Sequence, residues 1–295
     1  MLPPHLKGYT QIATAGVLSG LIGIFVKLTS QMPIGSIIFY RLLFGLIAIA
    51  LFFTCCRRLS ELRLGQKKQY MLLLGLMQAG TMLSYFISVK HTSVSIAVLL
   101  LYTAPVYVTL LSPFLLKEYI NRRSIFALAI AIIGVILVIR PDTLFQDVDY
   151  THLIGLAAGL FSGLFYGGMI LTSRYLKDYY TGTTQAAWAL LITLLIFAPY
   201  SIAVTPAILL DNLVVLVLFG LISTAMALVL YLSGLMQVRA QSASIIALLE
   251  PASAVVFAYI ILSEPVTASM LAGGALILLG AVIISRERPV EIAHE

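Results

Sequence analysis

The chain has 295 residues, of which 61% are hydrophobic and 10% are charged, and its formal net charge is +6. Soluble globular domains are about 45–50% apolar and about 25% charged, so a soluble fold of this length would leave many apolar side chains in water. The composition excludes a soluble domain and predicts an integral membrane protein. Since roughly 20 apolar residues cross the hydrocarbon core of a bilayer, the chain has room for about ten spans.

Apolar stretches separated by short polar breaks predict ten transmembrane helices, because a backbone in lipid must satisfy its hydrogen bonds internally. The short alternating segments of a membrane barrel are absent. The longest connections, 56–69 and 140–151, are too short for an inserted domain. The fold class is therefore all-α integral membrane, with spans at 9–29, 34–55, 70–89, 94–116, 124–139, 152–173, 183–202, 212–235, 241–262 and 268–285.

The distribution of positive charge predicts how the chain lies in the membrane. With the N-terminus inside, the cytoplasmic segments carry 14 of the 18 Lys and Arg residues. The positive-inside rule therefore predicts a multi-pass protein of the cell membrane with both termini in the cytoplasm. Because orientation accounts for the basic residues, no nucleic-acid partner is expected.

An internal repeat relates the two halves of the chain. A shift of 143 residues places "AGVLSGL" at 15–21 on "AGLFSGL" at 158–164. A shift of 146 residues superposes Tyr85 on Tyr231, Pro105 on Pro251, Glu118 on Glu264 and Gly134 on Gly280. The two halves are expected at 9–140 and 152–286.

Each half holds five predicted helices, an odd number. The second half must therefore enter the membrane from the opposite side, which makes the repeat inverted. Inverted five-helix repeats are typical of secondary transporters, whose binding site lies near mid-membrane between the halves.

Two segments carry a resemblance to a known family. The segment 99–141, "LLLYTAPVYVTLLSPFLLKEYINRRSIFALAIAIIGVILVIRP", resembles the fourth and fifth helices of EamA-type members of the drug/metabolite transporter superfamily. The segment 248–285, with "LEP" and then "SEP", resembles their ninth and tenth helices. The family's usual Gly-Glu is replaced here by Lys117-Glu118 and Ser263-Glu264, which puts the local loop packing in doubt.

The resemblance implies a ten-helix carrier with a central cavity lined by helices one, three, four, six, eight and nine. Many relatives export amino acids or other small metabolites, and others carry sugars, nucleotide-derived solutes or drug-like cations. The expected partners are a small-molecule substrate, the lipid bilayer and, where transport is coupled, a proton. A monomer would suffice for this architecture.

Glu250 is the most informative single residue, because it falls inside the apolar run "IIALLEPASAVVF". A carboxylate at mid-membrane costs about 2.5–3.5 kcal/mol on insertion scales, so it should face protein or a water-filled cavity. Pro251 follows and removes a helical backbone donor. Glu250 is expected to bind a cationic group of the substrate or to act as a coupling carboxylate. A structural interhelical hydrogen bond is the alternative.

Two intramembrane cations are further candidates. Arg41 either anchors to carbonyl groups or lipid headgroups or binds substrate. Lys27 either snorkels to the interface or lines the outer vestibule.

Polar residues at helical spacing complete the predicted cavity, although each tyrosine could instead join helices or lie at the membrane interface. Pro105 and Pro251 are the expected helix hinges. The candidate cavity residues are Gln78, Tyr85, Tyr102, Ser162, Tyr166 and Tyr231.

The sequence lacks a Walker motif, a dinucleotide loop and an HExxH motif. The four histidines lie near termini or span ends, so no metal site, cofactor or catalytic residue is expected. The hypothesis is a secondary carrier of small metabolites, chiefly amino acids or amine-bearing solutes, with export as the favoured direction. A carrier of another solute class remains open, and a membrane-embedded enzyme is a more remote alternative.

Overall fold

The structure, a computed structural model, describes residues 3–139 and 150–286. Ten helical segments in these ranges are long and apolar enough to cross a membrane, which confirms the predicted all-α membrane fold. Residue 140, the expected end of the first half, lies outside the described residues. The spans are His5–Leu28, Ile34–Cys55, Lys68–His91, Val94–Leu116, Arg122–Ile139, Tyr150–Asp178, Gly182–Ile202, Leu213–Leu235, Ala240–Leu262 and Ala268–Ser285.

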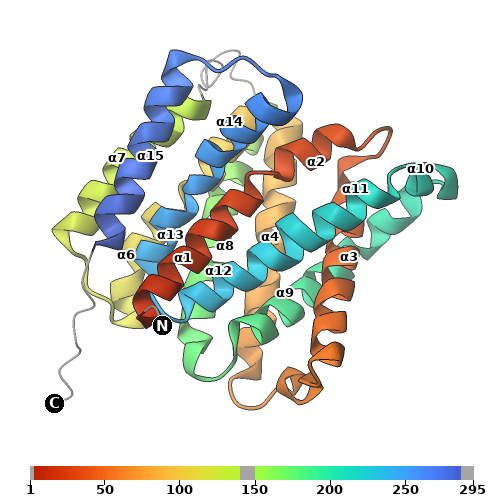
Figure 1. Cartoon of the computed structure of the whole chain (residues 1–295), viewed down its shortest axis with the longest axis horizontal. Helices are drawn as coiled ribbons and strands as arrows, with labels where there is room; N and C mark the ends of the chain where they lie inside the picture. Colours follow the sequence, from red (N-terminus) through yellow and green to blue (C-terminus); the bar gives the residue numbers. More distant parts are fainter. Residues whose placement is uncertain (1–2, 140–149, 287–295) are drawn as a thin grey trace.

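Several spans consist of more than one helix (Figure 1). The first half comprises α1 (Pro4–Ser19), α2 (Ile22–Leu28), α3 (Ile34–Cys55), η1 (Leu59–Leu62), α4 (Lys68–His91), α5 (Val94–Leu101), α6 (Ala104–Leu116) and α7 (Arg122–Ile139). The second half comprises α8 (Tyr150–Tyr175), η2 (Leu176–Asp178), α9 (Gly182–Phe197), η3 (Ala198–Ala203), α10 (Pro206–Asp211), α11 (Leu213–Leu218), η4 (Phe219–Met226), α12 (Ala227–Leu235), α13 (Ala240–Ala247), α14 (Leu249–Leu262) and α15 (Ala268–Ser285).

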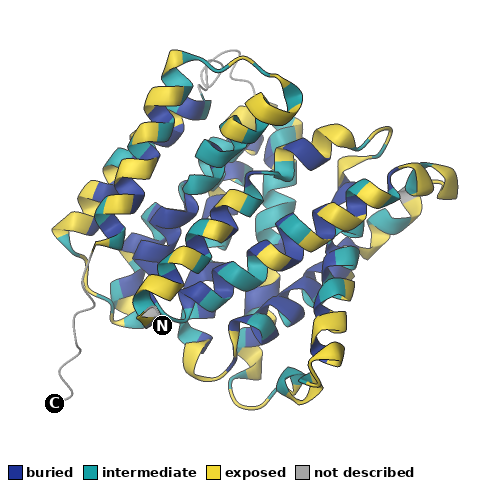
Figure 2. Cartoon of the chain, in the orientation of Figure 1, coloured by how far each residue is buried: buried dark blue, intermediate teal, exposed yellow. Residues whose placement is uncertain are grey.

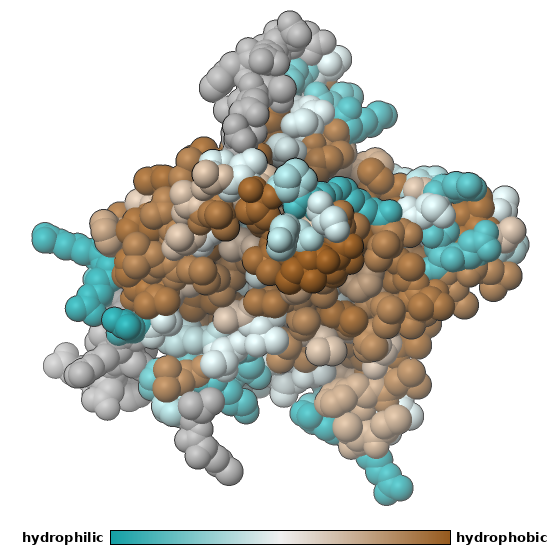
Figure 3. Space-filling view, turned by 45° about the horizontal axis from the view of Figure 1, so that its top comes forward, coloured by the Kyte–Doolittle hydropathy of each residue, from teal (hydrophilic) through white to brown (hydrophobic). Residues whose placement is uncertain are grey.

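The outer surface matches a bilayer environment. Many large apolar side chains are exposed on the helices, among them Phe114 at 83% and Leu195 at 65%. On the face drawn in Figure 3, apolar side chains cover most of the surface and many hydrophilic ones lie toward its margins. Water would disfavour this surface and hydrocarbon would not, so the fold is that of a multi-pass membrane protein.

The helix neighbours obey the inverted repeat. The contact of α1 with α12 in one direction corresponds to the contact of α8 with α4 in the other. In the same way, the contact of α6 with α8 corresponds to that of α14 with α1. The last helices of the halves, α7 and α15, pack on each other (Figure 1). This pattern is the one that a two-fold relation between five-helix halves requires.

Glycine permits the close approach of α7 and α15. A Cβ on Gly134 would lie 2.6 Å from the Gly273 carbonyl oxygen, and a Cβ on Gly273 would lie 2.5 Å from the Gly134 carbonyl oxygen. Both separations are shorter than a real Cβ contact, so the two backbones touch directly. Small residues of this kind drive helix packing in lipid, where the hydrophobic effect does not.

The fourth and ninth spans are both interrupted, at equivalent places. The fourth span breaks between α5 and α6, at Tyr102 and Thr103. Pro105 lies two residues after this break. The ninth breaks between α13 and α14 at Leu248, and Pro251 lies in the first turn of α14. The breaks interrupt the α-helical hydrogen-bond pattern at membrane depth, which is tolerated only inside protein or beside a cavity.

Two further irregularities were not expected from the sequence. The first span breaks near Gly20, between α1 and α2. The eighth span contains a π-helix, η4, from Phe219 to Met226. Its repeat partner, the third span, is one uninterrupted α-helix, α4, so the halves are not identical.

Here the end of the molecule where α1 begins and α15 ends is called the basic end, and the other is the opposite end. The basic end lies toward the bottom of Figure 1. It holds the connections between α3 and α4, α6 and α7, α8 and α9, and α12 and α13.

Candidate functional site

The site centres on the interruption of the ninth span. Glu250 is the second residue of α14, directly after the break at Leu248. Its side chain is partly buried, not enclosed. A carboxylate at a helix N-terminus lies near backbone N–H groups that carry partial positive charge, which favours its placement there.

Residues from four other spans surround Glu250. The Tyr102 hydroxyl, at the break of the fourth span, interacts with the Glu250 carboxylate. The Arg41 guanidinium of α3 and the phenols of Tyr85 in α4 and Tyr166 in α8 interact with it electrostatically. Five separate spans therefore bring one carboxylate, one guanidinium and three phenols together.

Arg41 is held by weak contacts and, within the described residues, forms no hydrogen bond to a carboxylate. Its Cζ lies 5.0 Å from the centroid of the Phe219 ring, a cation–π contact. One Nη lies 4.0 Å from the Met82 sulfur. The buried Nε has no hydrogen-bond partner, which leaves a donor for an incoming acceptor.

Tyr231 and Gln78 extend the polar cluster. The Tyr231 hydroxyl lies near that of Tyr166, yet it has no partner of hydrogen-bonding geometry. Gln78 is 7% exposed, and its buried Oε1 also lacks a partner. Gln78 lies two turns before Tyr85 on the same face of α4. Unpaired polar atoms of this kind are rare in a finished interior, so they indicate room for a polar ligand or water.

Lys27 and Ser162 lie apart from the interactions around Glu250. Lys27 forms an ion pair with Glu264 at the opposite end, where both side chains are exposed. Ser162 is fully buried, and its hydroxyl donates to the Gly159 carbonyl oxygen one turn earlier, at 2.6 Å. Their roles in substrate binding stay predictions.

Glycines of the first and sixth spans pack on the two breaks. A Cβ on Gly20 would lie 2.8 Å from the Cβ of Ser253, and one on Gly163 would lie 2.4 Å from the Oγ1 of Thr103. The repeat shifts superpose Gly20 on Gly163, while the contacted residues Ser253 and Thr103 differ by one helical turn. Each interrupted span therefore packs on a glycine of the other half.

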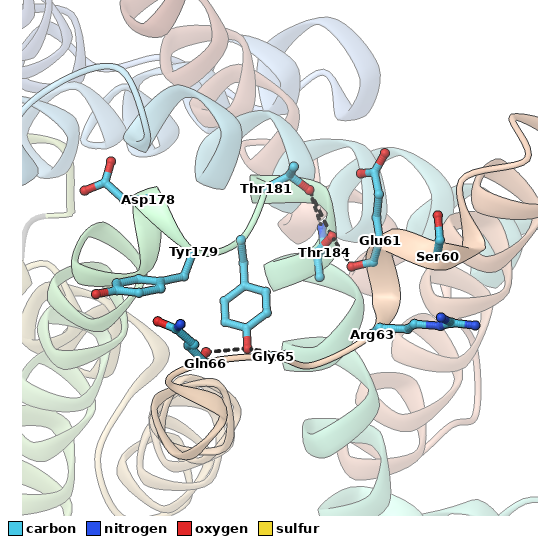
Figure 4. Close-up of a pocket in the computed structure, with 10 residues that line it drawn as sticks. Ser60, Glu61, Arg63, Gly65, Gln66, Asp178, Tyr179, Thr181 and Thr184 are labelled. Carbon is cyan, nitrogen blue, oxygen red and sulfur yellow. Dashed lines mark hydrogen bonds between the residues drawn. The ribbon is translucent and has the colours of Figure 1, made fainter.

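Two surface pockets lie away from Glu250, at the basic end. One of about 420 Å³ is bounded by the 60–66 connection and residues 178–184 (Figure 4). The Tyr180 hydroxyl there donates to the Gln66 carbonyl oxygen and accepts from the Gly65 N–H, at 2.6 and 3.0 Å. Hydrogen bonds between lining residues thus link the α3–α4 connection to the α8–α9 connection. The central cavity between the halves stays a prediction.

Charged groups outside the spans have neighbours that explain their titration. A bidentate hydrogen bond from Arg58, at 2.5 and 2.8 Å, lowers the pKa of Glu61 from its ordinary value. The pKa of Lys67 is raised by its interaction with the Tyr175 hydroxyl. Both groups are partly exposed to solvent, so these contacts contribute little to stability.

Sequence reasoning missed two parts of the structure. Phe219 stacks on Phe25 with centroids 5.2 Å apart and supports Arg41, and a sequence has no pattern that predicts a π-helix. The second omission is the ion pair between Glu118 and Arg174, with 3.1 Å between Oε1 and Nε. The superposition of Glu118 on Glu264 was the available signal for it.

Within the described residues, no three His, Cys, Asp or Glu side chains come together as metal ligands do. What the site can do chemically follows from its groups. A carboxylate, a guanidinium and several phenols bind polar solutes through charge and hydrogen bonds.

Comparisons with known proteins agree with this architecture. The EamA-like transporter family matches residues 6–140 and 153–286. An uncharacterized transporter of Archaeoglobus fulgidus is 32% identical over 284 residues, covering 95% of this chain and 97% of that protein. A pseudopaline exporter of Pseudomonas aeruginosa is 26% identical, with 93% of each chain covered.

A protein of known crystal structure shares the fold, with a TM-score of 0.81 at 17% identity and 95% of both chains covered. The relatives are named as transporters, which points to transport and away from enzymatic activity. The resemblance found in the sequence is confirmed: the chain belongs to the EamA-like transporter family.

Proposed function

We propose that the protein is a secondary carrier of small amine-bearing metabolites, amino acids foremost, which it binds around Glu250 and moves by alternating access. The observation that carries the proposal is the Glu250 carboxylate at a helix break, surrounded by Arg41, Tyr85, Tyr102 and Tyr166 from four other spans. A carboxylate in this position needs a cationic partner or a proton.

The chemistry suits a solute with two poles. Glu250 and the phenols accept hydrogen bonds from an ammonium group and orient it, and the unpartnered Nε–H of Arg41 donates to the carboxylate of the solute. In the empty carrier a proton takes the place of the ammonium group on Glu250. Competition between the two would couple solute movement to a proton gradient.

The hinges complete the proposed cycle. Pro105 and Pro251 follow the breaks of the fourth and ninth spans, where bending needs no further loss of helical hydrogen bonds. The carrier acts in the cell membrane with its basic end in the cytoplasm, in accord with the positive-inside rule. A relative named as a pseudopaline exporter supports export as its direction.

The test starts from purified protein and a thermal-shift screen of metabolites, because a ligand that binds the native state raises the apparent stability. Hits are then assayed for transport in proteoliposomes with and without a pH gradient. Glu250→Gln should abolish the thermal shift and the transport. Arg41→Gln should weaken binding of a carboxylate-bearing hit about 10- to 100-fold, because it removes a charge-assisted hydrogen bond.

Glu264→Gln is the matched control, since Glu264 is the carboxylate of an exposed ion pair at the opposite end. It should leave binding of the hit intact. If Glu250→Gln binds and transports at the unmodified rate across pH, the central site proposed here is wrong.

A further inference from the structure

The two halves differ in how deeply they enclose one pair of equivalent helices. The helices α5 and α13 have eight residues each and are related by the shift of 146 residues. All eight residues of α13 are buried, whereas in α5 only Ile96 and Ala97 are buried. In Figure 2 the α13 region is dark blue. The two halves therefore enclose equivalent helices unequally.

The buried half of the ninth span lies at the basic end, under the ion pair of Glu118 and Arg174. These side chains are 11% and 14% exposed. Arg174 Nη1 donates to the carbonyl oxygens of Leu235 and Met236, at 3.0 and 2.8 Å. Glu118 Oε2 accepts from the backbone N–H of Ala240, at 3.0 Å. One ion pair thus joins the ends of α6, α8 and α12 to the start of α13.

The counterpart of Glu118 in the repeat is Glu264, and its ion pair is different. Glu264 bonds Lys27 at the end of the first span, and these side chains are 41% and 59% exposed. In the described part of the chain, the Glu264 carboxylate bonds no other group. The ion pair at the basic end is therefore buried and cross-linked to backbone, and the one at the opposite end is neither.

A buried polar stripe leads from the basic-end ion pair toward Glu250. Gln241 Nε2 donates to Ser112 Oγ at 2.7 Å, while Gln241 Oε1 and Thr109 Oγ1 are buried without partners. Thr109 and Ser112 share a face of α6, which begins just after Tyr102, and Tyr102 interacts with Glu250. Buried donors and acceptors without partners are explained where water or a polar solute reaches them in another state.

We propose that Glu118 and Arg174 form a latch that closes the carrier at its basic end, and that the solute's route there runs past Gln241, Ser112 and Thr109 to Glu250 when the latch opens. The proposal rests on the proposed function, because only a carrier alternates between its two ends. Glu118 and Arg174 are positioning residues and do not touch the solute. The structure is then the state closed at the basic end.

The test measures access to the stripe by a thiol reporter. Cys55 and Cys56 are exposed free thiols, so both are first changed to serine. Thr109→Cys then supplies a reporter whose replaced hydroxyl had no partner. Its rate of modification by a water-soluble methanethiosulfonate is followed in detergent and from each side of vesicles.

Two latch variants have matched controls in the other half. Glu118→Gln is paired with Glu264→Gln. Ala240→Pro removes the N–H that bonds Glu118 without changing any charge, and Arg239, at φ −66° and ψ 149°, already has the backbone that a following proline requires. Its control is Val94→Pro, at the equivalent first residue of α5, where Ser93 is also extended at φ −120° and ψ 161°.

Both latch variants should raise the modification rate of Thr109→Cys roughly tenfold or more, the shift in population that the loss of one charge-assisted hydrogen bond produces. Neither control variant should raise it. Equal rates in the parent and the latch variants would overturn the latch, as would a lower melting temperature with an unchanged rate, which marks a merely structural tie. If Glu118→Gln does not fold, the result for Ala240→Pro decides the test. If Ala240→Pro does not fold either, Arg174→Lys takes its place.

The readout needs no solute, so it is independent of the proposed cargo. A failed latch with intact ligand binding at Glu250 would leave the carrier proposal standing. If the latch variants raise the modification rate but no metabolite shifts the melting temperature, the latch is supported and the proposed class of solute is wrong.

Discussion

At the scale of single residues, the two glutamates that mark the repeat follow residues in an unusual backbone conformation. Lys117 and Ser263 have φ of 57° and 53°, in the left-handed region that favours glycine. The N–H of Glu118 bonds the Ser112 carbonyl oxygen at 3.3 Å, and that of Glu264 bonds the Ala258 carbonyl oxygen at 3.2 Å. Both helices thus end in a cap with one left-handed residue, after which a backbone N–H bonds a carbonyl oxygen six residues earlier. Lys117 and Ser263, which stand where the family usually has glycine, keep this cap but adopt a strained backbone conformation.

Restoring the glycine should stabilise the fold. We expect Lys117→Gly and Ser263→Gly each to raise the free energy of unfolding by about 0.5–1 kcal/mol, because a non-glycine residue in the left-handed region is disfavoured by about 1–2 kcal/mol and glycine loses part of that gain to chain entropy. Thermal unfolding in detergent measures the effect. Thr267→Gly is the control: Thr267, at φ −88°, caps α15 through its hydroxyl, so it should lose stability. A loss in all three variants would contradict the strain.

At the scale of elements, the broken helices show what a sequence can and cannot predict. The ten spans and the break near Pro251 follow from apolar length and from the missing proline N–H. The break at Gly20 does not, because glycine within an apolar run is common in membrane helices. The π-helix at Phe219–Met226 is equally hidden, since it depends on how α3 packs against it.

The same limit applies to the site. Glu250, Arg41 and the tyrosines were predictable as candidates, because each is a polar group at membrane depth. Their meeting depends on five spans crossing at one level, which no local pattern encodes. The pairing of Glu118 with Arg174 was missed because both residues lie at span ends and look like ordinary interfacial charges.

The contact of α1 with the break of the ninth span can be tested through two nearby glycines. Gly20→Val should lower both transport and thermal stability, because a Cβ there would lie 2.9 Å from the backbone nitrogen of Ala254, which cannot move without the helix. Gly23→Ala is the control, since nothing lies within 4 Å of its Cβ position. It should be neutral or stabilising by up to about 1 kcal/mol. Equal effects of the two changes would refute the proposed fit.

At the scale of the whole molecule, the ten spans bring the start of α1 and the end of α15 to the basic end, together with the connections that carry most of the positive charge. The expected even count of spans is confirmed. The side of the membrane that the basic end faces stays a prediction, which rests on the positive-inside rule.

The native thiols test that orientation directly. Cys55 and Cys56 are exposed at the end of α3, at the basic end. A membrane-impermeant maleimide should leave them unmodified in intact cells and modify them once the membrane is permeabilised. Leu210→Cys, 68% exposed near the opposite end, should react in intact cells when Cys55 and Cys56 are replaced by serine. The reverse labelling pattern would invert the assigned topology.

The unequal enclosure of α5 and α13 has a thermodynamic consequence. In a carrier made of two interchangeable halves, the second end state is approached by giving each half the conformation that the other has now. With perfectly identical halves the two states would be isoenergetic, so the resting population of the empty carrier is set by sequence differences between the halves. The same substitution made at two equivalent positions should therefore shift this population in opposite directions. The difference between the two variants then measures the effect of the substitution on the free-energy difference between the two end states.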